Sequence, residues 1–277
     1  MAKFQPCIKW SGSKRSQSSS IIKYFPKNID TYYEPCVGGG SILRELLESD
    51  IVVNKCICSD INADLMNLWN EIKNNPKELI QHYRKLWEEM NVDEDTARKR
   101  EYYTNLRKEF NETHNPKDFL FLTRTAYNGM IRYNGKGEFN SPFHLNRNGI
   151  HPDKLEEIIL EWSELINKGN VEFICCDYKD ITPNENDFMY LDPPYANTKG
   201  MYYGALENTE LFDYLSNLKC KWLLSYDGVS GAKSKIYDVP KEIYDDHILL
   251  KSGNSSFKRI KEIDRNAMVY ESLYLKK

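Results

Sequence analysis

The first 62 residues contain short runs suited to strands and one run suited to a helix. Thr31–Glu34 is rich in aromatic and β-branched residues, which indicates a strand, and Ser41–Glu48 has helical spacing of its apolar positions. Between them lies Pro35–Gly40, which contains three consecutive glycines. Lys55–Ser59 is a second expected strand and is followed by Asp60. The order strand, turn, helix, strand predicts a βαβ unit and therefore a parallel sheet.

The middle of the chain has mostly helical periodicity. Apolar side chains recur every three or four positions over Leu65–Ile72 and again over Leu79–Trp87. Further helices are expected over Glu94–Glu112, Phe119–Tyr127 and Asp153–Lys168. This pattern predicts a block of helices between two groups of strands.

One segment inside the helical block has the pattern of a β-hairpin. Met130–Tyr133 and Glu138–Asn140 are short runs that suit strands. Asn134–Gly137 between them contains two glycines, which suits a tight turn. We therefore expect a hairpin that projects from the helices.

After the helical block the sequence returns to strand patterns, with one helix near Asn208–Asn217. The expected strands are Val171–Cys176, Phe188–Leu191, Trp222–Ser225, His247–Leu250 and Ala267–Leu275. Residues 1–62 and 169–277 together predict one α/β domain with a doubly wound sheet. Residues 63–168 are then a helical domain inserted into it.

Charge and composition restrict the partners only weakly. The 277 residues carry a net charge of −3. No uncharged apolar run approaches the roughly 18 residues that a membrane span needs, and the first residues lack a secretory signal. We therefore expect a cytoplasmic protein with no membrane partner. The stretch from Lys117 to Arg147 has more basic than acidic residues, and such a stretch can bind phosphates even in a near-neutral protein.

The seven cysteines and five histidines show no metal-binding pattern. An odd number of cysteines without a C-x-x-C pair argues against a disulfide framework and against a zinc site. Cys175 and Cys176 lie in an apolar run, so we expect two buried thiols there. We expect no metal and a reducing compartment. The serine cluster Ser16–Ser20 suggests a loop.

The glycine-rich loop after the first strand is a candidate ligand site. In Glu34–Ser41 the glycines allow close approach of the backbone to a ligand. Asp60, at the end of the next strand, has the position from which an acidic residue holds ribose hydroxyls in nucleotide-type ligands. The loop lacks the G-x-G-x-x-G fingerprint, and Glu34 would repel a pyrophosphate. A ligand with a positive ammonium and sulfonium, such as S-adenosylmethionine, suits it better than a dinucleotide. The alternative is a structural tight turn.

The motif Asp192-Pro193-Pro194-Tyr195 directly follows the expected strand Phe188–Leu191. An exocyclic amine on an aromatic base is a poor nucleophile because its lone pair is delocalised into the ring. The Asp192 carboxylate and the Pro193 carbonyl could each accept one N–H and direct the lone pair toward an incoming methyl carbon, while Tyr195 stacks on the base. The prolines stiffen the turn. The alternative is a strand exit without chemistry.

Such an amine is out of reach inside a stacked duplex, so the base must be flipped out by a second element that holds the DNA. The hairpin region carries basic, amide and apolar side chains that suit this task. They include Arg124, Tyr127, Asn128, Met130, Arg132, Asn134 and Lys136. For Tyr127 and Met130 the alternative is an ordinary core position.

Four motifs occur in the order typical of one family. They are Lys9–Lys14 (KWSGSK), Glu34–Ser41 (EPCVGGGS), Asp60–Asn62 (DIN) and Asp192–Tyr195 (DPPY). The whole chain resembles DNA adenine methyltransferases of the Dam type, the α group, in which the recognition domain lies between the donor-binding and catalytic motifs. The resemblance implies a Rossmann-like, doubly wound mixed sheet of the class I methyltransferase type with an inserted helical DNA-recognition domain that bears a β-hairpin.

The resemblance also implies a role for each motif. Asp192, Pro193, Pro194 and Tyr195 would form the catalytic pocket for a flipped-out adenine. S-adenosylmethionine would be held by Trp10, Lys14, Glu34, Pro35, Cys36, Val37, Gly38, Gly39, Ser41, Asp60, Asn62, Asp177, Tyr178 and Asp192. Double-stranded DNA would be held by Lys9, Arg124, Tyr127, Asn128, Met130, Arg132, Asn134 and Lys136. Without the resemblance, Lys9 and Lys14 would be ordinary solvated surface charges.

Several points stay open at this stage. Cys36 stands where the Dam type usually has an aromatic residue, and His144–Arg147 (HLNR) stands where that type commonly has Gly-Arg, so GATC is not carried over as the target sequence. The alternatives are a methyltransferase for the cytosine exocyclic amine, which more often has Ser in place of Asp192, and an inactive DNA-binding relative. We expect a monomer that has a cognate restriction endonuclease as a possible partner.

Overall fold

The computed structural model describes residues 5–194, 208–230, 233–234, 236–254 and 268–277. Its strands form one mixed sheet with the order β3-β2-β1-β4-β5-β8-β7. The strands are β1 (Asn28–Pro35), β2 (Val52–Asp60), β3 (Val171–Cys175), β4 (Phe188–Leu191), β5 (Lys221–Ser230), β7 (Asp246–Asn254) and β8 (Met268–Lys276). The short strand β6 (Lys233–Ser234) pairs with β5.

The first five strands of this order are parallel, and β8 is antiparallel to both β5 and β7. The sheet grows from β1 toward β2 and β3 on one side and toward β4 and β5 on the other. The carboxyl ends of β1 and β4 therefore meet at a topological switch point, where open α/β sheets bind ligands. The expected doubly wound mixed sheet is confirmed.

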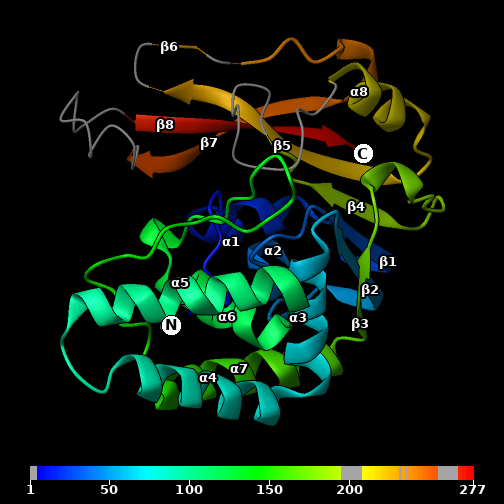
Figure 1. Ribbon diagram of the computed structural model, residues 1–277. Coiled ribbons are helices and arrows are strands. Elements are labelled where there is room, and N and C mark those ends of the chain that lie inside the picture. The colour runs from blue at the N-terminus through cyan, green and yellow to red at the C-terminus, as the bar shows by residue number, and fades with distance from the viewer. Residues whose placement is uncertain (1–4, 195–207, 231–232, 235, 255–267) are drawn as a thin grey trace.

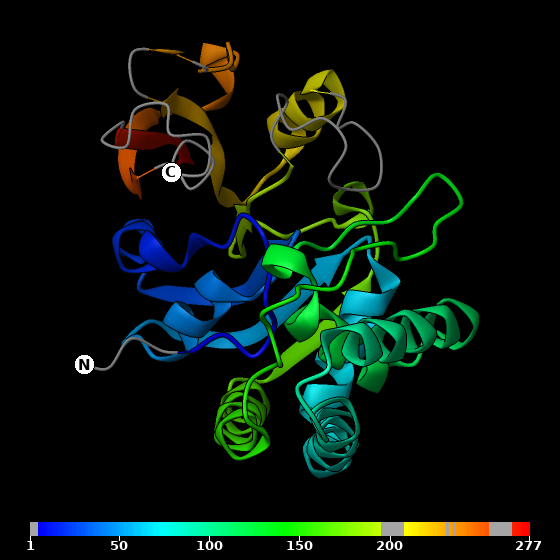
Figure 2. The ribbon, with the colours of Figure 1, turned by 60° about the vertical axis from the view of Figure 1, so that its left-hand side comes forward.

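The helices are α1 (Ser18–Ile21), α2 (Ser41–Leu47), α3 (Ala63–Asn74), α4 (Pro76–Met90), α5 (Thr96–Thr113), α6 (Pro116–Thr125), α7 (Pro152–Lys168) and α8 (Asn208–Asn217). Among these, all but α1 lie close to where the hydrophobic periodicity predicts them. Helices α4 to α7 gather at one end of the molecule, whereas β7 and β8 lie at the other end (Figures 1 and 2). Among the helices of the described ranges, none is both long enough and apolar enough to cross a membrane.

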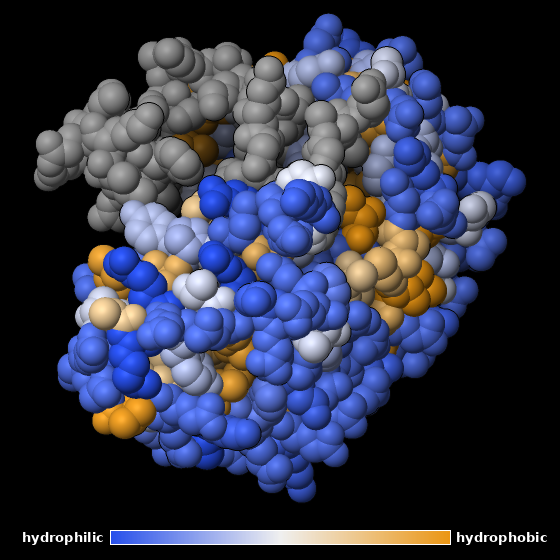
Figure 3. Space-filling view, viewed as in Figure 1, coloured by the Kyte–Doolittle hydropathy of each residue, from blue (hydrophilic) through white to orange (hydrophobic). Residues whose placement is uncertain are grey.

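Aromatic packing joins the helical block to the sheet. Trp69 on α3 stacks on Phe173 of β3 with ring centroids 5.1 Å apart, and Trp162 of α7 lies 5.1 Å from Trp69. One cluster of buried apolar residues accordingly continues from the strands into helices α3 to α7. The face seen in Figure 3 is mostly hydrophilic over these helices, with small separate apolar patches. The domain boundaries at residues 63 and 168 stay a prediction.

The expected hairpin consists of a tight turn and two isolated bridges. Tyr133 pairs with Phe139 and Ala126 with Phe143, both antiparallel. The Asn134 side-chain oxygen accepts hydrogen bonds from the backbone N–H groups of Lys136 (2.9 Å) and Glu138 (3.1 Å), which closes the turn. Backbone hydrogen bonds from the Asn134 N–H to the Glu138 carbonyl (2.9 Å) and from the Asn140 N–H to the Arg132 carbonyl (2.8 Å) join the two arms, so the hairpin is present with a short ladder.

Two local expectations are wrong. Cys175 is exposed and Cys176 is only half-buried, because they lie at and just after the end of the edge strand β3, beyond the buried Val171 and Phe173. Ser18 begins the short helix α1 instead of lying in a loop. Its hydroxyl donates to Glu45 of α2 at 2.8 Å, so a contact distant in sequence stabilises this turn.

Candidate active site

The sequence motifs converge at the carboxyl edge of the sheet. The Pro35–Gly40 loop follows β1, Asp60 ends β2, and Asp192 follows β4. The electrostatics of Cys36, within the loop, reflect this convergence: burial, and after it the negative charges of Asp60, Asp192, Asp177 and Glu34, hold the pKa of its thiol well above its usual value. Carboxylates from four separate segments therefore face one site.

Two tryptophans fix the glycine loop in shape. Gly38 has a φ of +48°, and a Cβ atom there would lie 2.6 Å from Nε1 of Trp10. On another side the indole N–H of Trp69 donates to the Gly38 carbonyl at 3.0 Å. The Val37 N–H donates to the carbonyl of Ser59 on β2 at 2.9 Å. Only glycine is therefore accommodated at position 38, where the backbone lies directly against the Trp10 ring.

Glu34 is buried at the end of β1. Its carboxylate accepts a hydrogen bond of 2.8 Å from the hydroxyl of Tyr32. Burial raises the pKa of Glu34 to about 8, although the Tyr32 hydrogen bond opposes the shift. A cationic group brought next to Glu34 would stabilise the ionised form, because an opposite charge lowers the pKa of a carboxyl.

Asp60 is positioned by the backbone that surrounds it. It accepts a hydrogen bond from the N–H of Asn62 at 3.0 Å, and the backbone N–H groups of Gly38 and Ile61 also stabilise its charge. Burial nevertheless raises its pKa to about 6. Asn62 caps helix α3 by accepting from the N–H of Leu65 at 3.0 Å. Asp60 is thus held rigidly at the start of α3 beside the glycine loop.

Asp177 and Tyr178 follow the edge strand β3. Asp177 caps the short 3-10 turn η4 (Tyr178–Asp180) by accepting from the N–H of Lys179 at 3.1 Å. Tyr178 is buried and packs edge-on against Tyr214 of α8, with ring centroids 5.2 Å apart. The structure therefore places Asp177 at the rim of the site and uses Tyr178 as part of its wall.

Asp192 is paired with a buried lysine. The Lys14 ammonium lies 2.7 Å from Oδ1 of Asp192 and 3.4 Å from Oε2 of Glu271 on β8. Burial acts to lower the pKa of Lys14, but these carboxylates more than offset it and hold the pKa above its usual value. Lys14 is therefore a buried, charged residue of the site and not a solvated surface charge. Pro193 is buried and Pro194 is half-buried; Tyr195 lies outside the described residues.

The expected DNA-binding residues divide into two groups. Arg132 and Lys136 are exposed on the hairpin, and Arg132 donates to the Asn140 side-chain oxygen at 2.7 Å. Arg124 instead faces inward, where its guanidinium donates to the carbonyls of Pro6 and Cys7 and holds the N-terminal segment.

Lys9 meets the recognition region beside Gly129, where a Cβ atom would lie 2.8 Å from Lys9 Cδ. Burial, and then the positive charges of Arg147 and Arg124, lower the pKa of Lys9 to about 8. Tyr127 is 46% exposed and stacks on His144 with ring centroids 5.3 Å apart. Tyr127 is therefore not a core residue. Met130 is half-buried, and Asn128 lies in the 3-10 turn η3 (Tyr127–Gly129).

Sequence reasoning missed two residues that shape the site. Glu271 shares the Lys14 ammonium with Asp192. Trp69 holds the glycine loop from α3. Glu271 lies in an ordinary strand pattern and Trp69 at an ordinary helical core position, so no local signal distinguishes them.

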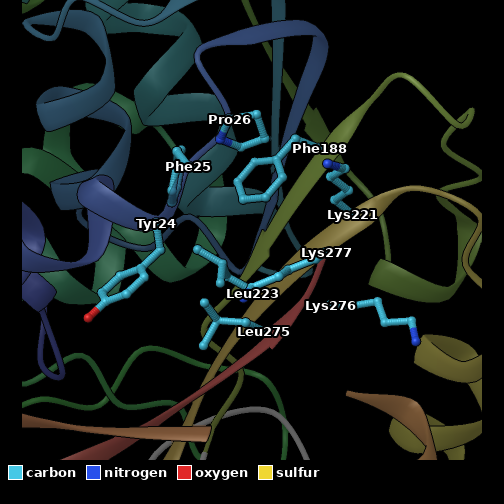
Figure 4. Close-up of a pocket in the computed structure, with 9 residues that line it drawn as sticks. All are labelled: Tyr24, Phe25, Pro26, Phe188, Lys221, Leu223, Leu275, Lys276 and Lys277. Carbon is cyan, nitrogen blue, oxygen red and sulfur yellow. The ribbon is translucent and has the colours of Figure 1, made fainter. Parts of the chain in front are cut away.

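A separate pocket lies away from these motifs. It is lined by aromatic, aliphatic and lysine side chains from residues 24–26, which precede β1, from β4, β5 and β8, and from the last residue of the chain (Figure 4). Phe188 and Lys221, which contribute to it, are the first residues of β4 and β5. The pocket therefore lies at the opposite end of these strands from Asp192.

Comparison with known proteins shows which family this chain matches. The family model described as D12 class N6 adenine-specific DNA methyltransferase matches residues 10–268. The chain is 37% identical to the type II methyltransferase M.MjaIII of Methanocaldococcus jannaschii over 206 residues, 69% of each chain. It is 35% identical to the DNA adenine methylase of Escherichia coli over 202 residues, 71% of this chain and 66% of that protein.

Among solved structures, a dimethyladenosine transferase from Plasmodium falciparum aligns with 95% of this chain and 62% of its own, at 11% identity. Its TM-score of 0.35 is too low to carry an argument. The match to the family model covers the glycine loop, Asp60, the helical block and Asp192. The chain therefore belongs to the D12 class N6 adenine-specific DNA methyltransferase family.

Proposed function

We propose that this adenine-specific DNA methyltransferase uses the carboxyl edge of β1, β2 and β4 as one active site for the methyl donor and the flipped-out adenine. The observation that carries the proposal is the convergence of Glu34, Asp60 and Asp192 around the Cys36 loop. The first two carboxylates belong to the donor side and the third to the base side. Because both sides meet at the switch point of the sheet, the methyl carbon and the amine can be brought into line.

The residues on the donor side fit S-adenosylmethionine. The buried carboxylate of Glu34 suits a positively charged ligand, and Asp60 offers an oxygen to ribose hydroxyls. The Trp10 ring lies so close to the Gly38 backbone that no side chain fits between them. Asp177 and Tyr178 would hold the adenine edge of the donor. When bound, S-adenosylmethionine supplies an electrophilic methyl carbon on a positively charged sulfur.

On the base side Asp192 and the Pro193 carbonyl would each accept one N–H of the target amine. These two acceptors hold the nitrogen with its lone pair toward the methyl carbon. Transfer of the methyl group to the nitrogen would release S-adenosylhomocysteine, and the proton lost by the nitrogen would pass to the Asp192 carboxylate and then to solvent. Pro194 stiffens the turn, and Tyr195 is proposed to stack on the base.

The DNA side consists of the hairpin and of the segment around Lys9. Burial, and then the positive charges of Arg147 and Arg124, lower the pKa of Lys9, so an anion is favoured beside Lys9, while the Arg124 guanidinium itself stays on the carbonyls of Pro6 and Cys7. A backbone phosphate supplies that charge. Arg132 and Lys136 extend the positive surface along the exposed hairpin. These residues, together with Tyr127, Asn128, Met130 and Asn134, would hold double-stranded DNA and fill the gap left by the flipped base.

We also propose that the protein acts as a monomer in the cytoplasm and that a restriction endonuclease shares its target. Two similar proteins carry names of type II methyltransferases, which supports a paired system. Size-exclusion chromatography with light scattering tests the assembly: a mass near 32.6 kDa supports a monomer, and twice that mass contradicts it.

Replacement of Asp192 by Asn tests the base side directly. The amide keeps the shape of the carboxylate but replaces one acceptor oxygen with a donor that opposes the incoming amine. We expect methyl transfer from tritium-labelled donor to plasmid DNA to fall by about 10²-fold or more. The donor dissociation constant, measured by calorimetry, should change much less.

The matched control is Asp213→Asn on the exposed face of α8, which should leave transfer unchanged. Near-normal turnover by Asp192→Asn would contradict the orienting role of Asp192.

A further inference from the structure

The Lys14 ammonium contacts the carboxylate that, in the proposed function, accepts a hydrogen bond from the target amine. Nζ of Lys14 is 2.7 Å from Oδ1 of Asp192, at hydrogen-bond distance, and the lysine side chain is only 6% exposed. Asp192 is the carboxylate assigned above to the target amine. The ammonium and the amine are both N–H donors, so they compete for the same oxygens. The contact of Lys14 with Oδ1 has to lengthen for the amine to use that oxygen.

A second carboxylate is already in place for Lys14. Oε2 of Glu271 lies 3.4 Å from Nζ of Lys14, and the Glu271 side chain is 19% exposed, the same fraction as that of Asp192. The ammonium thus lies between two carboxylates, nearer to Asp192 and farther from Glu271. A small movement of the lysine would exchange the nearer partner.

Glu271 is anchored for this role. Its other oxygen, Oε1, accepts a hydrogen bond of 2.7 Å from the hydroxyl of Ser252 on β7. The carbonyl of Ser252 in turn accepts from the hydroxyl of Ser16 at 3.3 Å. Ser16 belongs to the 3-10 turn η1 (Lys14–Ser16), the turn that Lys14 begins. One oxygen of Glu271 is therefore fixed to the framework, while the other stays directed at the lysine.

From this arrangement we infer that Glu271 is a positioning residue for methyl transfer, which takes over the Lys14 ammonium when the target amine binds Asp192. The inference rests on the proposed role of Asp192. Without a second carboxylate, moving the ammonium away from Asp192 would separate a buried positive charge from its counter-charge, which is costly. The lysine would then stay on Asp192 and keep the amine out.

Glu271→Gln tests the inference, because glutamine keeps the size and the Ser252 contact but removes the charge. The enzyme is preloaded with labelled donor and mixed with a duplex that contains the target site. We expect the single-turnover rate constant to fall at least tenfold. Dissociation constants for S-adenosylhomocysteine and for a duplex that lacks the target amine should stay within twofold of the wild type. Glu271→Asp, which keeps the charge, should retain more of the rate than Glu271→Gln.

A second readout separates this role from a merely structural one. A duplex with purine in place of the target adenine lacks the amine and does not compete with Lys14. The wild type should bind the adenine duplex more tightly than the purine duplex, and Glu271→Gln should lose most of this preference. Glu242→Gln, an exposed residue of the same C-terminal region, is the matched control and should behave as wild type in both assays.

Two results would overturn the inference: a rate for Glu271→Gln within twofold of wild type, or an equal loss of affinity for the adenine and purine duplexes. Thermal unfolding of each variant shows whether a substitution impairs folding. If Glu271→Gln has a folding defect, the rate constant and the duplex preference of Glu271→Asp test the inference instead. Failure of the wild type itself to methylate DNA would instead refute the proposed function.

Discussion

At the scale of single residues, each of three carboxylates in the site has a different electrostatic environment. Asp192 is paired with an ammonium, Asp60 is held by backbone N–H groups, and Glu34 accepts from the Tyr32 hydroxyl and from the backbone N–H of Leu43. Their positions at strand ends could be predicted from the sequence, because glycine loops and strand patterns are local. Their electrostatic states could not be predicted, since Lys14 and Glu271 are brought to Asp192 by the fold.

The raised pKa of Glu34 predicts a pH dependence of donor binding. At pH 7 a carboxyl with a pKa of about 8 is mostly protonated, whereas the positive ammonium of the ligand favours its ionised form. Binding should therefore release up to one proton, and affinity should rise as the pH goes from about 6 to 8, by at most about tenfold per unit.

Calorimetry with S-adenosylhomocysteine across this pH range measures the effect. Glu34→Gln should remove the dependence, and Glu164→Gln, on the exposed face of α7, should keep it. A pH-independent affinity in the wild type would show that Glu34 does not pair with the ligand's positive charge.

At the scale of elements, helix and strand positions follow the periodicity closely. The expected strand Phe188–Leu191 and helix Asn208–Asn217 have the same bounds in the structure. Segments that depend on distant contacts deviate. Helix α1 depends on the Ser18–Glu45 hydrogen bond, and Cys175 is exposed at the end of the edge strand β3, whose place in the sheet sequence periodicity does not reveal.

A glycine-to-alanine substitution in the glycine loop, compared with one in the hairpin turn, tests the role of the loop. Gly38→Ala places a Cβ atom 2.6 Å from Trp10 and imposes a φ of +48° on alanine, which costs roughly 1–2 kcal/mol for the backbone alone. We expect lower thermal stability and at least a tenfold weaker affinity for S-adenosylhomocysteine in calorimetry.

Gly135→Ala in the hairpin turn is the control, since a Cβ atom there would meet nothing within 4 Å. Its donor affinity should stay within twofold of wild type. Equal donor affinities for the two variants would contradict the assignment of the Gly38 loop to the donor pocket.

At the scale of the whole molecule, the order of motifs along the chain predicts the architecture. Strand, glycine loop, helix and strand, then helices, then Asp192 after another strand, are enough to predict a doubly wound sheet with an insertion. The position of Arg124 could not be predicted. It lies in a basic stretch that suggests DNA contacts, yet its guanidinium holds the carbonyls of Pro6 and Cys7, which are more than a hundred residues away in sequence. Only the three-dimensional fold shows which cations stay exposed.

The central claim is that this chain methylates adenine at a specific DNA site through Asp192. The most direct measurement is to express the wild type and Asp192→Asn in a bacterial host without DNA methylation and to sequence the genomic DNA by a modification-sensitive method. We expect methylated adenine at one sequence motif with the wild type and none with Asp192→Asn. Methylated cytosine, or an unmodified genome in cells where the wild-type protein is folded and binds its donor, would contradict the account.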